Sequence, residues 1–408
     1  MSPAKKSLDE RLQQIVQHAY ANAPAVQDLF DRAGVNPEDI QGVADLSRLP
    51  VTSKDQLVAQ QQANLPFGGW LAVPAEKLRH IFISPGPIFD PEAGEEVGVQ
   101  GVAEAFRAVG IGPGDVVLNT FLYHMVPAGL LMDAALNLLG ATVVPTGPGN
   151  TDFQVQIAMA LRATGFVGTP SFLKIILDEV EKKGIPGPAF PIEKAFFSAE
   201  PYPPSLRKVF EEEFGMRTGQ AYATADLGVI AYECEQAHGL HYSSELIVEV
   251  VGPDGKPLGP GQQGEVVVTT FNQTYPLIRL GTGDLSAFID EPCACGRPGR
   301  RLLGWMGRVG DAVKVRGMFL HPNQLQAAVA RLPGLGRFQA VVTRPEARDM
   351  FTLRVELTSE TADRATLADA LKTAVREACR LGLDNVEFLG PGSIPQDARP
   401  VVDERTWE

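Results

Sequence analysis

Short apolar runs alternate with helix-like segments throughout the middle of the chain. The apolar runs cover residues 116–118, 141–144, 165–168 and 194–198, and helical periodicity covers residues 128–139, 152–163, 171–183 and 204–214. This alternation predicts a mainly parallel sheet with helices on its faces. Because such sheets bind ligands beyond the carboxyl ends of their strands, we expect functional residues in the loops 146–151, 198–201 and 222–226.

The pattern becomes strand-like after Tyr222. Residues 246–251 and 264–270 flank a Gly-Pro-Asp-Gly turn, which predicts a small β-subdomain. Beyond Gly304, further apolar runs and an amphipathic helix at 365–379 indicate a compact α+β unit. The predicted fold class is therefore α/β, with a large N-terminal domain of mainly parallel sheets and a β-subdomain, followed by a small α+β C-terminal domain.

We expect the N-terminal domain to cover residues 1–306, a hinge to cover 307–311, and a mobile C-terminal domain to cover 312–408. Glycines surround the hinge at positions 304, 307, 310 and 317. Glycine absorbs large changes of φ and ψ, which suits a hinge, and ordinary turns are the alternative explanation.

The chain is acidic, since 36 Lys and Arg residues oppose 49 Asp and Glu residues for a net charge of −13. This balance argues against a nucleic-acid partner. The most apolar stretch, 126–145, is interrupted by Asp133 and Asn137, and residues 1–11 contain no apolar signal segment. We therefore expect a cytoplasmic protein that neither spans nor binds a membrane.

Seven short motifs, each weak alone, follow one another in a specific order. They are Ser-Ala-Glu-Pro at 198–201, Tyr-Ala-Thr-Ala-Asp at 222–226, Glu-Cys at 233–234 with Gly-Leu-His at 239–241, Gly-Glu at 264–265, Pro-Leu-Ile-Arg-Leu-Gly-Thr-Gly-Asp-Leu at 276–285, Cys-Ala-Cys-Gly-Arg at 293–297, and Gly-Arg-Val-Gly-Asp-Ala-Val-Lys-Val-Arg-Gly at 307–317. In this order they resemble the AMP-forming adenylating superfamily, and within it the phenylacetate–CoA ligase-like branch.

The resemblance implies a reaction in two steps. A carboxylate and ATP give an acyl-adenylate and pyrophosphate, and coenzyme A then displaces AMP. It implies an aromatic or related small carboxylic acid as substrate, ATP with Mg²⁺, and coenzyme A as partners. The oligomeric state stays open, with a homodimer among the options.

The resemblance also assigns roles to residues at the nucleotide. Asp226 would hold Mg²⁺, Asp284 would accept both ribose hydroxyls, and Arg308 would follow the ribose contact at the domain junction. Glu200 and Pro201 would lie against adenine, on which Tyr222 would stack. The set of nucleotide-binding candidates is Ser84, Gly86, Glu200, Pro201, Tyr222, Thr224, Asp284 and Arg308.

An acyl pocket is expected at the loops after successive strands. By position, its lining would be Tyr123, His124, Gly147, Gly149 and Pro170. For His124, a hydrogen-bonded core imidazole is the alternative to carboxylate recognition.

Two departures from the family pattern concern phosphate binding. In the stretch 84–91, which matches the phosphate-binding loop, Asp90 stands where a lysine is expected, and Pro85 and Pro87 remove backbone N–H donors. Near the C-terminus, Asp397 stands at the position of the catalytic lysine, with Arg399 two residues on.

These departures leave two functions open. Arginine could replace the missing lysines, and the candidates are Arg300, Arg301, Arg399 and Arg405. Asp226, Arg308 and Arg399 would then be the catalytic residues of an acid–thiol ligase. The alternative is a degenerate, non-adenylating homologue that binds an AMP-like or acyl-CoA ligand, as an acyl-transfer or regulatory protein.

The cysteines suggest a metal site. Cys293 and Cys295, with Cys234 and His241, would form a Cys₃His structural zinc site. His241 is preferred to His238 because it belongs to the family motif. Three buried, reduced thiols are the alternative, and Cys379 is expected to pack in the core of the C-terminal domain.

Overall fold

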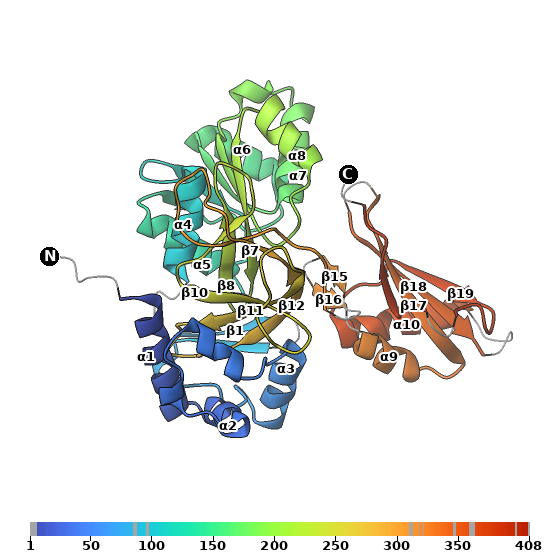
Figure 1. Cartoon of the computed structure of the whole chain (residues 1–408). Helices are drawn as coiled ribbons and strands as arrows, with labels where there is room; N and C mark the ends of the chain where they lie inside the picture. The colour runs from blue at the N-terminus through green and yellow to red at the C-terminus, as the bar shows by residue number, and fades with distance from the viewer. Residues whose placement is uncertain are drawn as a thin grey trace. The chain divides into compact units, whose positions relative to one another are not determined.

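The computed structural model describes residues 6–84, 88–94, 98–309, 313–316, 318–320, 322–345, 348–358, 364–395 and 398–406. The chain forms two compact units, Met1–Gly307 and Arg308–Glu408 (Figure 1). Residues 310 and 311 of the expected hinge lie outside the described residues, so a hinge at 307–311 stays a prediction.

A nine-stranded sheet forms the centre of the first unit, as the alternating pattern predicted. Its strand order is β13-β14-β9-β8-β7-β6-β5-β3-β4. The parallel strands are β3 (Val116–Asn119), β4 (Thr142–Val144), β5 (Gly165–Gly168), β6 (Lys194–Phe197) and β7 (Arg217–Thr224). The antiparallel strands are β8 (Gly228–Glu233), β9 (Leu240–Tyr242), β13 (Phe288–Ile289) and β14 (Arg301–Leu302).

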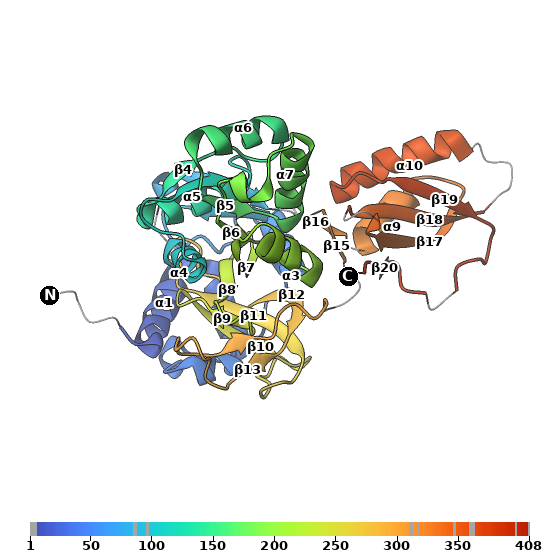
Figure 2. The same cartoon turned by 90° about the horizontal axis from the view of Figure 1, so that it is seen from above.

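Helices cover both faces of this sheet (Figure 2). Val167 and Phe196 pack against α4 and α5, whereas the neighbouring Phe166 and Phe197 join the core under α6 and α7. The alternation arises because successive side chains of a strand point to opposite faces. The helices are α4 (Val99–Val109), α5 (Ala128–Leu138), α6 (Thr151–Leu161), α7 (Pro170–Lys182) and α8 (Pro204–Lys208), which continues into a π-helical turn, Val209–Glu213.

The predicted β-subdomain is a three-stranded antiparallel sheet, β10 (Leu246–Val251), β11 (Gly264–Thr270) and β12 (Leu280–Ser286). It shares a core with the N-terminal helices. The elements of this N-terminal region are α1 (Leu8–Asn22), α2 (Pro24–Ala33), α3 (Lys54–Ala63), and the hairpin of β1 (His80–Ser84) with β2 (Ile88–Glu92). Short 3₁₀ turns occur at Pro37–Asp39, Val43–Arg48, Ala75–Lys77 and Gly187–Ala189.

The second unit contains a sheet of order β19-β18-β17-β20 and a hairpin. The strands are β17 (Leu335–Thr343), β18 (Met350–Leu357), β19 (Asn385–Leu389) and β20 (Val401–Asp403), and the hairpin is β15 (Val313–Val315) with β16 (Met318–Leu320). Helices α9 (Pro322–Ala330) and α10 (Arg364–Cys379) pack with this sheet in one core. Cys379 is buried in that core, as predicted.

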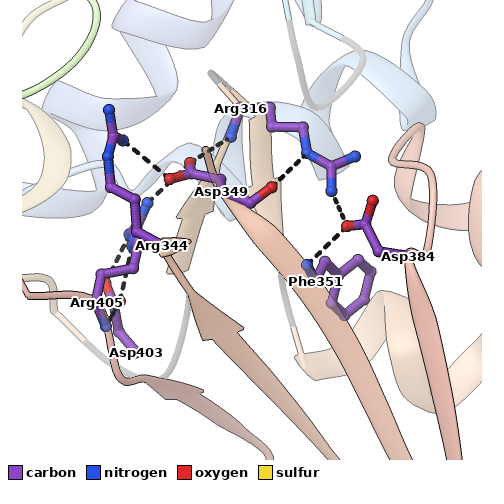
Figure 3. Close-up of polar contacts among 7 residues, drawn as sticks. All are labelled: Arg316, Arg344, Asp349, Phe351, Asp384, Asp403 and Arg405. Atoms are coloured by element: carbon purple, nitrogen blue, oxygen red, sulfur yellow. Dashed lines mark hydrogen bonds and ion pairs between the residues drawn. The ribbon is translucent and has the colours of Figure 1, made fainter. Parts of the chain in front are cut away.

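A network of charged side chains connects the ends of these strands (Figure 3). Asp349 accepts hydrogen bonds from Arg344 at 2.9 Å, from Arg405 at 3.1 Å and from the backbone N–H of Arg316 at 3.0 Å. Arg316 also pairs with Asp384, and Arg405 pairs with Asp403 at 2.6 Å. Arg405 is therefore paired within the second unit, and its suggested role as a replacement phosphate ligand stays a prediction.

None of the helices in the described part of the chain is long and apolar enough to cross a membrane. A cytoplasmic location stays a prediction.

Replacing Arg405 by glutamine should destabilise the second unit by about 2–3 kcal/mol, because a largely buried ion pair loses one partner while Asp349 keeps Arg344. Faster hydrogen exchange at the amides of β17 and β18 would show this loss. Arg331→Gln is the matched control: Arg331 pairs with Glu377 at the surface, and exposed pairs contribute at most about 1 kcal/mol. Equal effects of the two substitutions would contradict the prediction.

Candidate functional site

Tyr222 and Asp284 meet where the large sheet adjoins the β-subdomain. The Tyr222 hydroxyl, on β7, donates to Oδ2 of Asp284, on β12, at 2.8 Å. The indole N–H of Trp305 donates to Oδ1 at 3.1 Å. Tyr222, Asp284 and Trp305 also line one small pocket. A buried carboxylate that accepts one donor on each oxygen can accept two hydroxyl groups in their place.

Asp226 follows β7 in a tight turn, and its side chain is almost fully buried. One of its oxygens forms an ion pair with Nζ of Lys54 at 2.5 Å and lies 3.4 Å from the hydroxyl of Thr224. Lys54 was not among the residues singled out from the sequence. The available signal was its position directly after the helix-capping Ser53, since a cation in the first turn of a helix opposes the helix dipole.

The described residues in the segment expected to be a phosphate-binding loop lie in the paired strands β1 and β2 instead. Ser84 on β1 pairs directly with Ile88 on β2, and Asp90 is a strand residue opposite Phe82. Gly86, a nucleotide-binding candidate, lies outside the described residues. The expectation that Asp90 belongs to an open loop was wrong, because Asp90 is paired within the strands β1 and β2.

The carboxyl group of Asp90 points into the protein. Oδ2 accepts a hydrogen bond from the Ser84 hydroxyl, whereas Oδ1 is buried with no hydrogen-bond partner among the described residues. Burial, together with the negative charge of Asp226, raises the pKa of Asp90 to about 8, although Ser84 and Lys54 oppose the shift. The position that has a lysine in the family pattern therefore carries a buried acid.

Glu200 and Pro201 lie in the loop after β6, where Ala199 adopts a left-handed conformation with φ of 74°. Oε1 of Glu200 accepts the backbone N–H of Ser171 at 2.6 Å, in the first turn of α7. A carboxylate is favourable there because unpaired N–H groups and the positive end of the dipole meet at a helix N-terminus. Pro201 is exposed. Glu200 thus connects the loops that follow β6 and β5.

The acyl-pocket candidates follow the neighbouring strands β3, β4 and β5. The Tyr123 hydroxyl accepts from Asn119 at 2.7 Å and donates to Asp133 at 2.8 Å. Burial and the Asp133 carboxylate raise the pKa of this tyrosine. His124 is exposed, so its interpretation as a core imidazole was wrong.

The glycine and proline candidates have backbone roles in the same region. The carbonyls of Gly147 and Gly149 each accept a hydrogen bond from the Gln154 amide at 2.8 Å, and both glycines have positive φ. Pro170 is buried as the first residue of α7. Because β4, β3 and β5 are adjacent, the loops that carry these residues emerge side by side at one edge of the sheet.

The arginines proposed as replacements for lysine have other partners. Arg300 pairs with Asp290 at 3.0 Å and stacks over Phe288, and Arg301 is buried, with hydrogen bonds to the carbonyls of His238 and Glu291. The structure therefore does not place Arg300 or Arg301 as phosphate ligands. Arg399 is exposed just before β20, and Arg308 is half-buried at the start of the second unit. Asp397 lies outside the described residues.

Four predicted metal ligands come together at the other end of the antiparallel strands. Single ligand atoms of Cys234, His241, Cys293 and Cys295 all lie within 4.8 Å of one another. The sulfurs of Cys234 and Cys293 are 3.7 Å apart, and Cys295 Sγ is 3.3 Å from Nε2 of His241. His238 instead contacts Arg301.

The pKa values of two members of this cluster, His241 and Cys295, are lowered. Burial, followed by the charges of Arg297 and Arg301, lowers the pKa of His241 and favours its neutral form. Although burial opposes ionisation of Cys295, hydrogen bonds from Arg297 lower the pKa of this thiol. Neutral imidazole and thiolate are the forms that bind metal ions.

Asp90→Asn should alter the dependence of stability on pH. The pKa of Asp90 rises from 3.8 to about 8 on folding, so the wild-type chain should lose stability as the pH rises between these values. The variant has no such group, and its melting temperature should match the wild type near pH 4 and exceed it near pH 8. Parallel pH profiles of the two proteins would contradict this prediction.

Comparisons with known proteins identify the family of the chain. Residues 317–405 match the model of the AMP-binding enzyme C-terminal domain. The phenylacetate–coenzyme A ligases of Thermus thermophilus and Escherichia coli are 31% and 29% identical to the chain and align over 97% and 95% of it, and over 96% and 91% of their own lengths.

A solved structure is similar over almost the whole chain. It is the crystal structure of a 2-hydroxyisobutyryl-CoA ligase in complex with 2-HIB-AMP and CoA in the thioesterification state. Its TM-score is 0.88 at 27% identity, and the match covers 97% of this chain and 88% of that one. The fold and the resemblance predicted from the ordered motifs are thereby confirmed, and the chain belongs to the phenylacetate–CoA ligase family.

Proposed function

We propose that this protein is an AMP-forming acid–CoA ligase. It activates an aromatic or related small carboxylic acid with ATP and transfers the acyl group to coenzyme A. The observation that carries the proposal is the near full-length similarity to phenylacetate–CoA ligases, in a chain where Tyr222 and Asp284 gather at one site. The non-adenylating alternative is not favoured, because these similarities are to CoA ligases.

The first half-reaction joins the acid to AMP. A carboxylate oxygen attacks the α-phosphorus of ATP, the bond between the α- and β-phosphates breaks, and pyrophosphate leaves. Asp284 would accept the ribose hydroxyls after releasing Tyr222 and Trp305. Ser84, Gly86, Glu200, Pro201 and Thr224 complete the proposed nucleotide site.

Asp226 fits a magnesium site, because a buried carboxylate is the type of oxygen ligand that Mg²⁺ prefers. The bound ion would neutralise charge on the phosphates. Arg308 and Arg399 would be catalytic residues contributed by the second unit. Residues 307–311 would form the hinge that lets this unit move.

In the second half-reaction, the thiol of coenzyme A attacks the acyl carbonyl and AMP leaves with the bonding electrons. The acid would lie among the loops after β3, β4 and β5, near Tyr123, His124, Gly147, Gly149 and Pro170. The exposed His124 ring is available there to donate to a carboxylate, whereas the Tyr123 hydroxyl donates its proton to Asp133.

The direct test is conversion of ATP to AMP by the purified protein with Mg²⁺, coenzyme A and a panel of acids that includes phenylacetate, benzoate and 2-hydroxyisobutyrate. We expect AMP formation that requires one of the acids, with the matching CoA thioester detected by mass spectrometry. Failure with every acid, together with calorimetric binding of AMP or an acyl-CoA but not of ATP, would favour the non-adenylating alternative.

Asp284→Asn should raise the KM for ATP by roughly 10- to 100-fold, because a hydrogen bond to a charged acceptor contributes about 1.5–3 kcal/mol. The KM for coenzyme A should change little. Asp290→Asn is the control, since this carboxylate is half-exposed and pairs with Arg300. Steady-state kinetics with each substrate varied in turn provides the measurement, and equal changes in both KM values would contradict the assignment.

We also propose that Cys234, His241, Cys293 and Cys295 hold a structural zinc ion. In a tetrahedron with Zn–S bonds of about 2.3 Å, two sulfurs lie roughly 3.8 Å apart, and Cys234 and Cys293 are separated by 3.7 Å. The ion would fasten the loop 293–297 to strands β8 and β9. The donors therefore fit zinc in number, type and spacing.

Metal analysis should find about one zinc ion per chain, and a chelator should lower the melting temperature, because the ion binds only the folded site. Cys293→Ser should reduce both the zinc content and the melting temperature. Cys379→Ser, which removes a buried thiol from the second unit, should keep the zinc. Full zinc content in the Cys293 variant would exclude this ligand set.

A further inference from the structure

We propose that Lys54 is the phosphate-binding cation of this enzyme, taking over the task of the lysine that Asp90 replaces. In the resting protein it pairs with Asp226, and in the ATP complex it contacts the phosphates while Asp226 holds Mg²⁺. This inference rests on the proposed function and extends it to a residue at the start of α3. That residue lies about thirty positions before the hairpin of β1 and β2, which departs from the family's phosphate-binding pattern.

The backbone at Lys54 is fixed to the strand that carries Asp284. Thr52 forms a β-bridge with Leu280 at the start of β12, with hydrogen bonds of 3.0 Å to the carbonyl of Arg279 and 2.8 Å from the N–H of Gly281. Ser53 then caps α3, and its hydroxyl accepts the N–H of Gln56. The position of Lys54 relative to the ribose-binding carboxylate is therefore set by backbone contacts.

Two acidic side chains, Asp226 and Asp90, lie near Lys54, and a cation is favourable beside them. The side chain of Asp226 is almost completely buried, and the buried carboxyl group of Asp90 interacts electrostatically with both Asp226 and Lys54. As the first residue of α3, Lys54 also opposes the helix dipole. Its ion pair with Asp226 offsets this cost.

The same arrangement allows Lys54 to change partners. Its side chain is 17% exposed, against 2% for Asp226, so the ammonium group borders solvent. Mg²⁺ at Asp226 would repel the ammonium group, and the triphosphate would attract it. A flexible four-carbon stem permits this short shift without movement of the backbone.

Tyr222 and Asp226 show where the phosphates would extend. Tyr222 contacts Asp284 at the ribose end, and β7 then ends at Thr224, just before the turn that holds Asp226. A nucleotide whose ribose lies at Asp284 and whose metal lies at Asp226 has its phosphates beside Lys54. Helix α3 also packs against β2, the strand of Asp90, and against β12.

This role makes Lys54 important for only one of the two half-reactions. Pyrophosphate must leave in adenylation, and a cation stabilises the charge that develops on it. No pyrophosphate takes part in thioester formation, where the thiol displaces AMP. A lysine needed only for folding would affect both half-reactions equally.

The experiment compares Lys54→Gln, Lys54→Arg and the control Lys77→Gln, which removes the same charge from an exposed position. Lys54→Gln should slow acid-dependent adenylation by about 10²- to 10³-fold. Thioester formation from the synthetic acyl-adenylate and coenzyme A should stay within about threefold of the wild type. Lys54→Arg should recover at least part of the adenylation rate, and Lys77→Gln should behave as the wild type.

Two results would overturn the proposal. One is adenylation by Lys54→Gln at the wild-type rate, and the other is an equal loss in both half-reactions. If the wild type itself does not adenylate any acid, the proposed function fails, and calorimetry tests Lys54 separately. Weaker binding of ATP·Mg²⁺ with unchanged binding of AMP in Lys54→Gln would then support the phosphate contact, and equal affinities for ATP in both proteins would refute it.

Discussion

Strand β7 is parallel to β6 along one edge and antiparallel to β8 along the other, and the site of this protein depends on that change of direction. A parallel neighbour places the end of β7 among the loops that follow β3, β5 and β6. An antiparallel neighbour lets the chain return at once toward the β-subdomain. Tyr222 and Asp226 consequently lie where loops of the parallel sheet meet β12, which is where the proposed nucleotide site is located.

The burial of Asp90 and the charge of Lys54 explain how the hairpin of β1 and β2 is compatible with a phosphate site. Asp90 is buried in β2 and shares a hydrogen bond with Ser84, and burial favours its neutral form. It therefore repels phosphate less than an exposed aspartate in an open loop would. The nearby positive charge comes from Lys54 at the start of α3, and this segment is bridged to β12 through Thr52.

Different interactions hold the loops and strand ends of the two units in place. In the first unit, three cysteines and a histidine gather beside short strands, and the proposed metal ion would hold these segments together. In the second unit, Asp349 binds three arginines through side chain or backbone and connects the hairpin to the sheet (Figure 3). Arginine suits this task because its planar group donates in several fixed directions.

The sequence by itself determined the α/β class, the order of the strands along the chain, the family and the members of the Cys/His cluster around Cys293, since periodicity and motif order depend on neighbouring residues. Only the tertiary structure decided which charges meet. Lys54 and Asp226 are separated by more than 170 positions, and no local pattern links them. The burial of Asp90, the exposure of His124 and the engagement of Arg301 and Arg405 likewise follow from packing between distant segments, because the environment of a charge is set by what folds around it.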